Sequence, residues 1–150
     1  MMQNYYRLCG NGNNVFQHWI ARTREDGISP WISTRMNDIH EVNNEQHPFH
    51  SEFWRVHPEA RRSMYHDVGR ADRALDFGRQ DVRDRHFAFI EEIMELYDID
   101  GLELDWMRFG YHFRPGFEEE GAALLTEFTA SVRRLLDSWE AKRGHRIELS

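Results

Sequence analysis

The sequence predicts an α/β fold in which parallel strands alternate with helices, and three observations support this prediction. Residues 101–105 alternate apolar and acidic side chains after an Asp-Gly turn, as a strand does. Apolar residues recur at three- and four-residue steps in 82–97 and in 119–142, which indicates a helix on each side of that strand. Two more strands are expected, at 28–36 and from Arg146 onward. Strands that alternate with helices are typical of parallel β/α units, in which helices cover the strands.

Alternation gives the central strand one apolar face and one acidic face. Leu102 and Leu104 share one side with Trp106. Glu103 and Asp105 share the other side. Carboxylates on an inner face are costly unless they are paired or used in function. An exposed antiparallel strand would show the same pattern, but the flanking helices favour a covered parallel strand. We therefore take Asp105, at the carboxyl end of the strand, and Glu103, one step deeper, as the candidate catalytic residues.

The strand expected at 28–36 directs an arginine toward these carboxylates. Alternation places Ser33 and Arg35 on the same face. If the opposite face meets the helices, these two side chains point inward, toward Glu103 and Asp105. An arginine in that position would hold the carboxylates ionised and lower their pKa values. A surface arginine at the end of a strand is the simpler alternative.

Helical periodicity and capping residues predict three helices. The first is expected over 15–25 with Asn14 as its N-cap, and the last, over 119–142, is expected to stop at Gly144. The middle helix, over 82–97, carries a broad apolar stripe that we interpret as core. The side chains expected on the buried sides of the three helices are Phe16, Trp19, Ile20, Val82, His86, Phe89, Ile90, Ile93, Met94, Tyr97, Leu124, Leu125, Phe128, Val132, Leu135, Leu136 and Trp139.

Two loops follow the strands and are expected to border a pocket. The segment 37–74 lacks clear periodicity and holds five of the nine histidines. Loops of this length are usually functional or disordered, and in barrel enzymes they follow the carboxyl ends of strands. The segment 109–117 is rich in aromatic residues and would lie beside Asp105, where it could contact a sugar or pack beneath the loop.

Composition limits the classes of partner. The net charge of −7, from 26 acidic and 19 basic residues, disfavours nucleic acid, which needs a concentrated basic surface. No apolar run approaches the roughly 20 residues that cross a bilayer, so no membrane partner is expected. The single cysteine, Cys9, excludes an internal disulfide. The five tryptophans would suit stacking on sugar rings, although aromatic residues more often belong to a core.

Three motifs resemble one family. The runs LDFGRQDVRD (75–84) and YDIDGLELDWMR (97–108), with the helix between them, resemble the middle of glycosyl hydrolase-like β/α-barrel proteins. The run WISTRMNDIH (31–40) is similar to the strand end that precedes them in that family. The resemblance implies a TIM barrel, a carbohydrate substrate, and Asn37, Asp38 and His40 as pocket residues. Because a complete barrel needs roughly 250 residues, we expect residues 1–150 to form a single domain that is a partial (β/α) barrel, a fragment of a larger one. A small self-contained α/β unit is the alternative.

The chemistry that this resemblance implies is hydrolysis of a glycosidic bond by two carboxyl groups, one of them Asp105. No cofactor is expected, and exposed strand edges would allow self-association. One alternative is a carbohydrate-binding module without catalysis. Another is a metal-dependent hydrolase, suggested by Asp38, His40 and the loop histidines, although their spacing matches no standard ligand set. The candidate substrate-binding residues are Arg35, Asn37, Asp38, His40, Trp106, Arg108, Tyr111 and His112.

Overall fold

The computed structural model of the 150-residue chain describes residues 9–63, 69–107 and 109–150. Three parallel strands form one sheet in the order β1-β2-β3: β1 is Trp31–Arg35, β2 is Gly101–Asp105 and β3 is Glu148–Leu149. The prediction of an α/β chain with parallel strands is therefore confirmed. The strand expected at 28–36 is shorter than predicted, because pairing with β2 begins only at Trp31.

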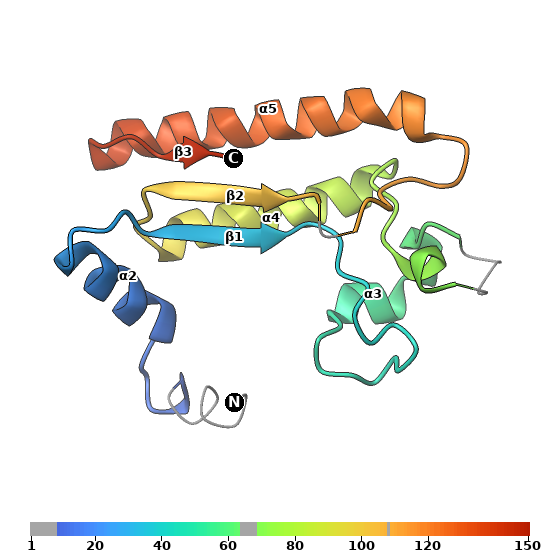
Figure 1. The fold of residues 1–150 in the computed structure, drawn as a ribbon, viewed down its shortest axis with the longest axis horizontal. Coiled ribbons are helices and arrows are strands. Elements are labelled where there is room, and N and C mark those ends of the chain that lie inside the picture. Colours follow the sequence, from blue (N-terminus) through green and yellow to red (C-terminus); the bar gives the residue numbers. More distant parts are fainter. Residues whose placement is uncertain (1–8, 64–68, 108) are drawn as a thin grey trace.

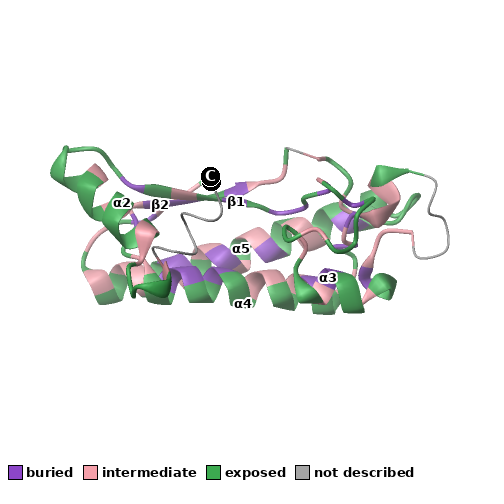
Figure 2. Ribbon diagram, turned by 90° about the horizontal axis from the view of Figure 1, so that it is seen from below, coloured by how far each residue is buried: buried purple, intermediate pink, exposed green. Residues whose placement is uncertain are grey.

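The sheet is covered by two long helices on one of its faces. Helices α4 (Gln80–Leu96) and α5 (Glu118–Arg143) both lie along that face (Figures 1 and 2). Leu102 and Leu104 point into the core between the sheet and these helices, and both are buried. In the part of the chain that the structure describes, the opposite face of the sheet is open, and Ser33 and Glu103 are exposed on it.

The predicted helix ends match the structure closely. Helix α2 spans Val15–Glu25, and the side chain of Asn14 accepts a hydrogen bond from the backbone N–H of Gln17. Helix α5 ends at Gly144, which adopts a left-handed conformation with φ of 76°. The C-terminal strand, predicted from Arg146, pairs with β2 only at Glu148–Leu149.

On two helices, fewer side chains are buried than the helical periodicity predicted. On α4, Val82, Ile90, Ile93 and Met94 are buried, but Phe89 is 48% exposed. Its side chain borders a groove beside β1 and does not lie under the sheet. On α2 no residue is fully buried, and Phe16 and Trp19 are 40% and 62% exposed, because this helix packs against the edge of the sheet and not its face.

The long polar segment after β1 contains short helices around a second, smaller core. It includes α3 (Glu52–Val56) and the 3₁₀ turns η1 (Pro58–Ala60) and η2 (Arg70–Arg73). The indole N–H of Trp54 donates to the carbonyl of Arg73 at 2.8 Å. The buried side chains of this core are Ile39, Val42, Trp54 and Ala74. This segment is therefore a folded lobe beside the carboxyl ends of the strands (Figure 1).

A cluster of charged side chains connects the ends of α2 and α5 to the residues just before β2. His145 Nε2 lies 2.8 Å from Asp98 Oδ1, and its Nδ1 lies 4.0 Å from Asp100 Oδ1. Arg24, near the end of α2, pairs with both carboxylates, and Arg143 Nε approaches Asp98 Oδ1 at 3.6 Å. The hydrogen bond to Asp98 is the largest cause that raises the pKa of His145 above its usual value.

This cluster of charged side chains predicts a pH-dependent stability. A histidine whose pKa is raised by folding contributes stability that is fully present below its unfolded pKa of about 6.5 and is lost as the pH rises through the folded value. The difference in unfolding free energy between the wild type and His145→Gln should therefore shrink between about pH 5.5 and about pH 8.5. Urea unfolding at several pH values measures it, with His18→Gln on the exposed side of α2 as the matched control. A difference that stays constant with pH would contradict the assignment.

None of the helices in the described ranges is both long enough and apolar enough to span a bilayer.

Candidate functional site

The open face of the sheet carries a cluster of polar side chains where β1 and β2 end. The parallel register places Ser33 beside Glu103 and Arg35 beside Asp105. Arg35 Nε lies 3.9 Å from Asp105 Oδ2, and Arg35 Nη1 lies 3.1 Å from Asp38 Oδ2. The guanidinium thus lies between Asp38 and Asp105, whereas the alternation pattern predicted a position between Glu103 and Asp105.

Asp38 and His40 form a tight turn immediately after β1. Asp38 Oδ1 lies 2.6 Å from His40 Nδ1 and accepts the backbone N–H of His40 at 2.8 Å. Partial burial would raise the pKa of Asp38, but the hydrogen bonds from the backbone and ring of His40 and from Arg35 outweigh it and lower the pKa. Asp38 is therefore held in its charged form beside Arg35.

Asp105 ends β2 and is half-buried, whereas Glu103 lies one step deeper along the strand and is exposed. Asp105 Oδ1 accepts the backbone N–H of Met107 at 3.2 Å, which fixes the carboxylate over the strand end. Of the two predicted catalytic residues, Asp105 belongs to the cluster with Arg35. Glu103 faces the same side, but its register partner is Ser33, farther from the strand ends.

Asn37 is next to this cluster in sequence but does not face it. Its side chain is 3% exposed. The amide Nδ2 donates to the carbonyls of Leu75 and Tyr111 at 2.9 and 2.8 Å, and Oδ1 accepts the N–H of Leu75 at 3.0 Å. All three bonds go to backbone, so Asn37 joins the end of β1 to two distant loops and is placed as a positioning residue.

Trp106 and His112 lie on the helix side of the sheet. Trp106 packs edge-on against Phe77 and Phe128, at ring distances of 5.1 and 6.0 Å. His112 Nε2 lies 3.0 Å from the carbonyl of Trp106, and burial lowers the pKa of this histidine. The structure therefore places these two predicted substrate-binding residues half-buried against the core, away from the open face that Asp105 shares with Arg35.

The aromatic loop after β2 does approach the strand ends. Phe109 packs against the ring of His40 at 5.2 Å. Tyr111 is 43% exposed, and the guanidinium of Arg62 lies 5.4 Å from its ring. Tyr111 is therefore available for contact with a ligand. Arg108, the remaining candidate in this loop, lies outside the described residues.

One buried carboxylate near the site was missed as a functional candidate. Asp76 is 2% exposed, accepts the N–H of Gly78 at 2.9 Å, and pairs with Arg114 at 3.1 Å. It joins the start of α4 to the aromatic loop, because Arg114 lies in that loop. The signal in the sequence was an acidic residue between Leu75 and Phe77 in an otherwise apolar run.

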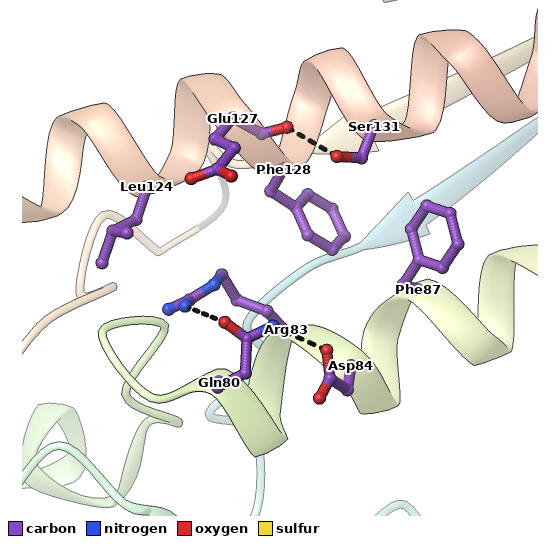
Figure 3. Close-up of a pocket in the computed structure, with 8 residues that line it drawn as sticks. All are labelled: Gln80, Arg83, Asp84, Phe87, Leu124, Glu127, Phe128 and Ser131. Carbon is purple, nitrogen blue, oxygen red and sulfur yellow. Dashed lines mark hydrogen bonds between the residues drawn. The ribbon is translucent and has the colours of Figure 1, made fainter.

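A separate hollow of about 250 Å³ lies between α4 and α5 (Figure 3). Its polar side chains bond to one another: Arg83 Nη2 donates to Gln80 Oε1 at 2.6 Å, and Gln80 Nε2 donates to Asp84 Oδ1 at 2.7 Å. It contains none of the predicted site residues. The strand-end cluster remains the stronger candidate site.

The described ranges contain no group of three or more His, Cys, Asp or Glu side chains placed to hold a metal ion. The loop histidines instead contact nearby residues. His50 stacks on Trp54 at 4.1 Å, and His57 pairs with Glu59 at 2.8 Å.

A scan against protein-family models found no match to this sequence, and a search of curated proteins found none either. The functional proposal therefore depends on the geometry of the strand ends.

Proposed function

We propose that this chain is a glycoside hydrolase-like protein that binds a carbohydrate and hydrolyses a glycosidic bond at the ends of β1 and β2. The observation that supports the proposal is the placement of two carboxylates, Asp38 and Asp105, on either side of Arg35 at the carboxyl end of a parallel sheet. Glycoside hydrolysis normally uses two carboxyl groups. The carboxyl ends of parallel strands are also where β/α enzymes hold their reacting groups.

The arrangement of the strands supports a β/α-barrel wall as the architecture of this site. The strands follow one another in the order β1-β2-β3, and α4 and α5 lie on the same face. Crossovers between parallel strands share one hand, so successive steps in one direction place their helices on one side. In a barrel that side is the outside, and the opposite, polar face lines the interior. The face with Arg35 and Asp105 would then be the interior face.

In the proposed reaction the two carboxyl groups have different tasks. Asp38, whose pKa is lowered, stays ionised and stabilises positive charge that develops on the sugar ring. Asp105 acts as a general base and takes a proton from the attacking water, and this proton then passes to the leaving sugar. Water supplies a hydroxyl to the sugar carbon and a proton to the leaving sugar, so the bond is hydrolysed without any other reactant. Arg35 keeps the two carboxylates apart and orients both.

A carbohydrate-binding module without catalysis is the second candidate, because two aromatic side chains are exposed. Tyr111 lies in the loop after β2 and is 43% exposed, and Trp31 lies at the start of β1, at the opposite end of the strand from Arg35, and is 44% exposed. Aromatic faces of this kind stack on apolar sugar faces. A binding module would use these rings and would not require Asp38 and Asp105 to share one arginine.

A panel of polysaccharides and aryl glycosides, assayed for release of reducing ends or aryl alcohol, tests the proposal. Affinity electrophoresis on the same polysaccharides measures binding separately. Hydrolysis that persists in the presence of a chelator supports the carboxylate mechanism, and hydrolysis that the chelator abolishes would favour a metal-dependent enzyme. Binding without hydrolysis would replace the proposal by the binding module. Absence of both would refute both candidates.

A further inference from the structure

His40 is bonded to Asp38 through one of its two ring nitrogens. Asp38 Oδ1 lies 2.6 Å from His40 Nδ1, and the same oxygen accepts the backbone N–H of His40 at 2.8 Å. Asp38 is held in its charged form, and an ionised carboxylate can only accept hydrogen bonds. The Nδ1 atom of His40 therefore carries a proton and donates it to Asp38.

Arg35 is a weaker neighbour of the same nitrogen. Arg35 Nη1 lies 3.5 Å from His40 Nδ1, at the outer limit of a hydrogen bond, and 3.1 Å from Asp38 Oδ2. A guanidinium N–H can bond to Nδ1 only if that nitrogen carries no proton. Because the contact between Nδ1 and the carboxylate is much shorter, the proton stays on Nδ1 and Arg35 donates to Asp38 instead.

The other ring nitrogen of His40, Nε2, has no partner in the part of the chain that the structure describes. The side chain of His40 is 33% exposed, so a ligand can reach this nitrogen. A histidine whose Nδ1–H is held by a carboxylate can give or take a proton at Nε2. The Asp38–His40 pair is therefore equipped for proton transfer.

The turn that carries His40 is fixed on both sides. Ile39 is 4% exposed and belongs to the core of the lobe. Glu41 has a φ of 56°, a left-handed conformation that residues other than glycine rarely adopt, and its carbonyl accepts a hydrogen bond from His50 Nε2 at 2.9 Å. Phe109 packs edge-on against the His40 ring at 5.2 Å. Backbone strain of this kind is often found where a side chain must be held in one orientation.

We propose that His40 is the general acid of the strand-end site and donates the proton on Nε2 to the leaving sugar. This inference rests on the proposed function and adds the group that it lacks. Asp105 takes a proton from the attacking water, but the glycosidic oxygen needs a proton of its own while the bond breaks. His40 and Asp105 both lie against Arg35, at 3.5 and 3.9 Å, so the acid and the base belong to one site.

The proton transfers balance over one turnover. The imidazolium gives its Nε2 proton to the glycosidic oxygen as the bond from that oxygen to the sugar carbon breaks. The water oxygen bonds to the same carbon while Asp105 takes one proton from the water. That proton then returns to Nε2, which restores both groups, so one water is consumed in all. Asp38 stays ionised throughout and offsets the positive charge of the imidazolium.

Nitrogen NMR of the His40 ring tests the arrangement without any substrate. In a pH titration, Nε2 should be the nitrogen that loses its proton, and Nδ1 should keep its own because it is bonded to Asp38. The spectrum of His40→Gln identifies the signals that belong to this ring. Loss of the proton from Nδ1 would overturn the proposal, because Nε2 would then point no acidic proton at the sugar.

Dependence on the leaving group tests the role in catalysis. Two aryl glycosides of one sugar serve as probes: the dinitrophenyl glycoside, whose leaving group departs without a proton, and the phenyl glycoside, whose leaving group needs one. His40→Gln should lower kcat/KM for the phenyl glycoside by about 10²–10⁴-fold. It should leave kcat/KM for the dinitrophenyl glycoside within a few-fold of the wild type. A residue that only supports the structure would affect both substrates alike.

His57→Gln is the matched control. His57 lies between α3 and η1, and its Nδ1 lies 2.8 Å from Glu59 Oε1, so it forms the same kind of pair in the lobe. This variant should hydrolyse both glycosides as the wild type does. Equal losses for both glycosides in His40→Gln, or no loss, would overturn the acid role and leave the hydrolysis itself standing. A wild type that hydrolyses neither glycoside, nor any other member of the panel, would instead refute the proposed function, and the acid role with it.

Discussion

Replacing Asp105 by Asn is expected to lower the rate of glycoside hydrolysis by about 10²–10⁴-fold while sugar binding is retained. The amide has the shape of the carboxyl group and can still accept the backbone N–H of Met107, so the end of β2 should keep its conformation. It cannot take a proton from the attacking water and carries no charge toward Arg35. The measurement is kcat for reducing-end release, with affinity electrophoresis on the same sugar.

Two controls accompany this variant. Asp84→Asn makes the same chemical change on the exposed side of α4, in the hollow between α4 and α5, and should leave the rate unchanged. Glu103→Gln changes the other acidic side chain of β2 and should cause a smaller loss, because Glu103 lies one step deeper than Asp105. A rate for Asp105→Asn within a few-fold of the wild type would exclude Asp105 from catalysis. Equal losses of binding and rate would instead indicate a binding role.

Local patterns in the sequence predicted the central strand and the helix ends well. The bounds of β2, Gly101–Asp105, follow from strict alternation after an Asp-Gly turn, because one residue of slippage would reverse its apolar and acidic faces. The contact of Arg35 with Asp105 followed from the same alternation applied to two strands, whereas its contact with Asp38 did not. Asn14 and Gly144 each satisfy a local requirement of a helix end, so nearby residues suffice to predict them.

Local patterns could not predict contacts between segments that are far apart in the sequence. The partners of Asn37 lie 38 and 74 residues away in sequence. Its motif therefore suggested a pocket residue, whereas in the structure its buried side chain joins two distant loops; we call this set of hydrogen bonds the Asn37 clamp. Trp106 shows the same limit. Alternation placed it on the apolar side of β2, as the structure does, whereas its proximity to Asp105 in sequence suggested the pocket. Adjacent residues of an extended chain face opposite ways, so closeness in sequence did not bring Trp106 to the site.

The exposure of Phe89 has a related cause. Helical periodicity shows which residues share one side of α4, but not how much of that side the sheet covers. Because β1 is the outermost strand, the sheet does not extend over Phe89. This side chain instead borders the groove beside β1. The width of a buried stripe therefore depends on the number of neighbouring strands, which one helix cannot encode.

Replacing Asn37 by Leu is expected to lower the free energy of unfolding by about 3 kcal/mol, from a range of about 1–3 kcal/mol for each buried backbone group left without a partner. Leucine has a similar volume but no polar atoms. The N–H and C=O of Leu75 and the C=O of Tyr111 would lose their bonds to the Asn37 side chain. Because Asn37 is 3% exposed, water cannot readily replace those bonds.

Urea unfolding monitored by circular dichroism measures this loss, and Asn43→Leu is the matched control. Asn43 is exposed in the same segment, so the same substitution there should change the unfolding free energy by no more than about 0.5 kcal/mol. The Asn37 clamp also orders the loops that carry Phe109 and Tyr111 beside the strand ends. We therefore expect the folded Asn37→Leu protein to bind sugar more weakly, although Asn37 itself does not face the cluster. A variant as stable as the wild type would show that the clamp does not hold these loops together.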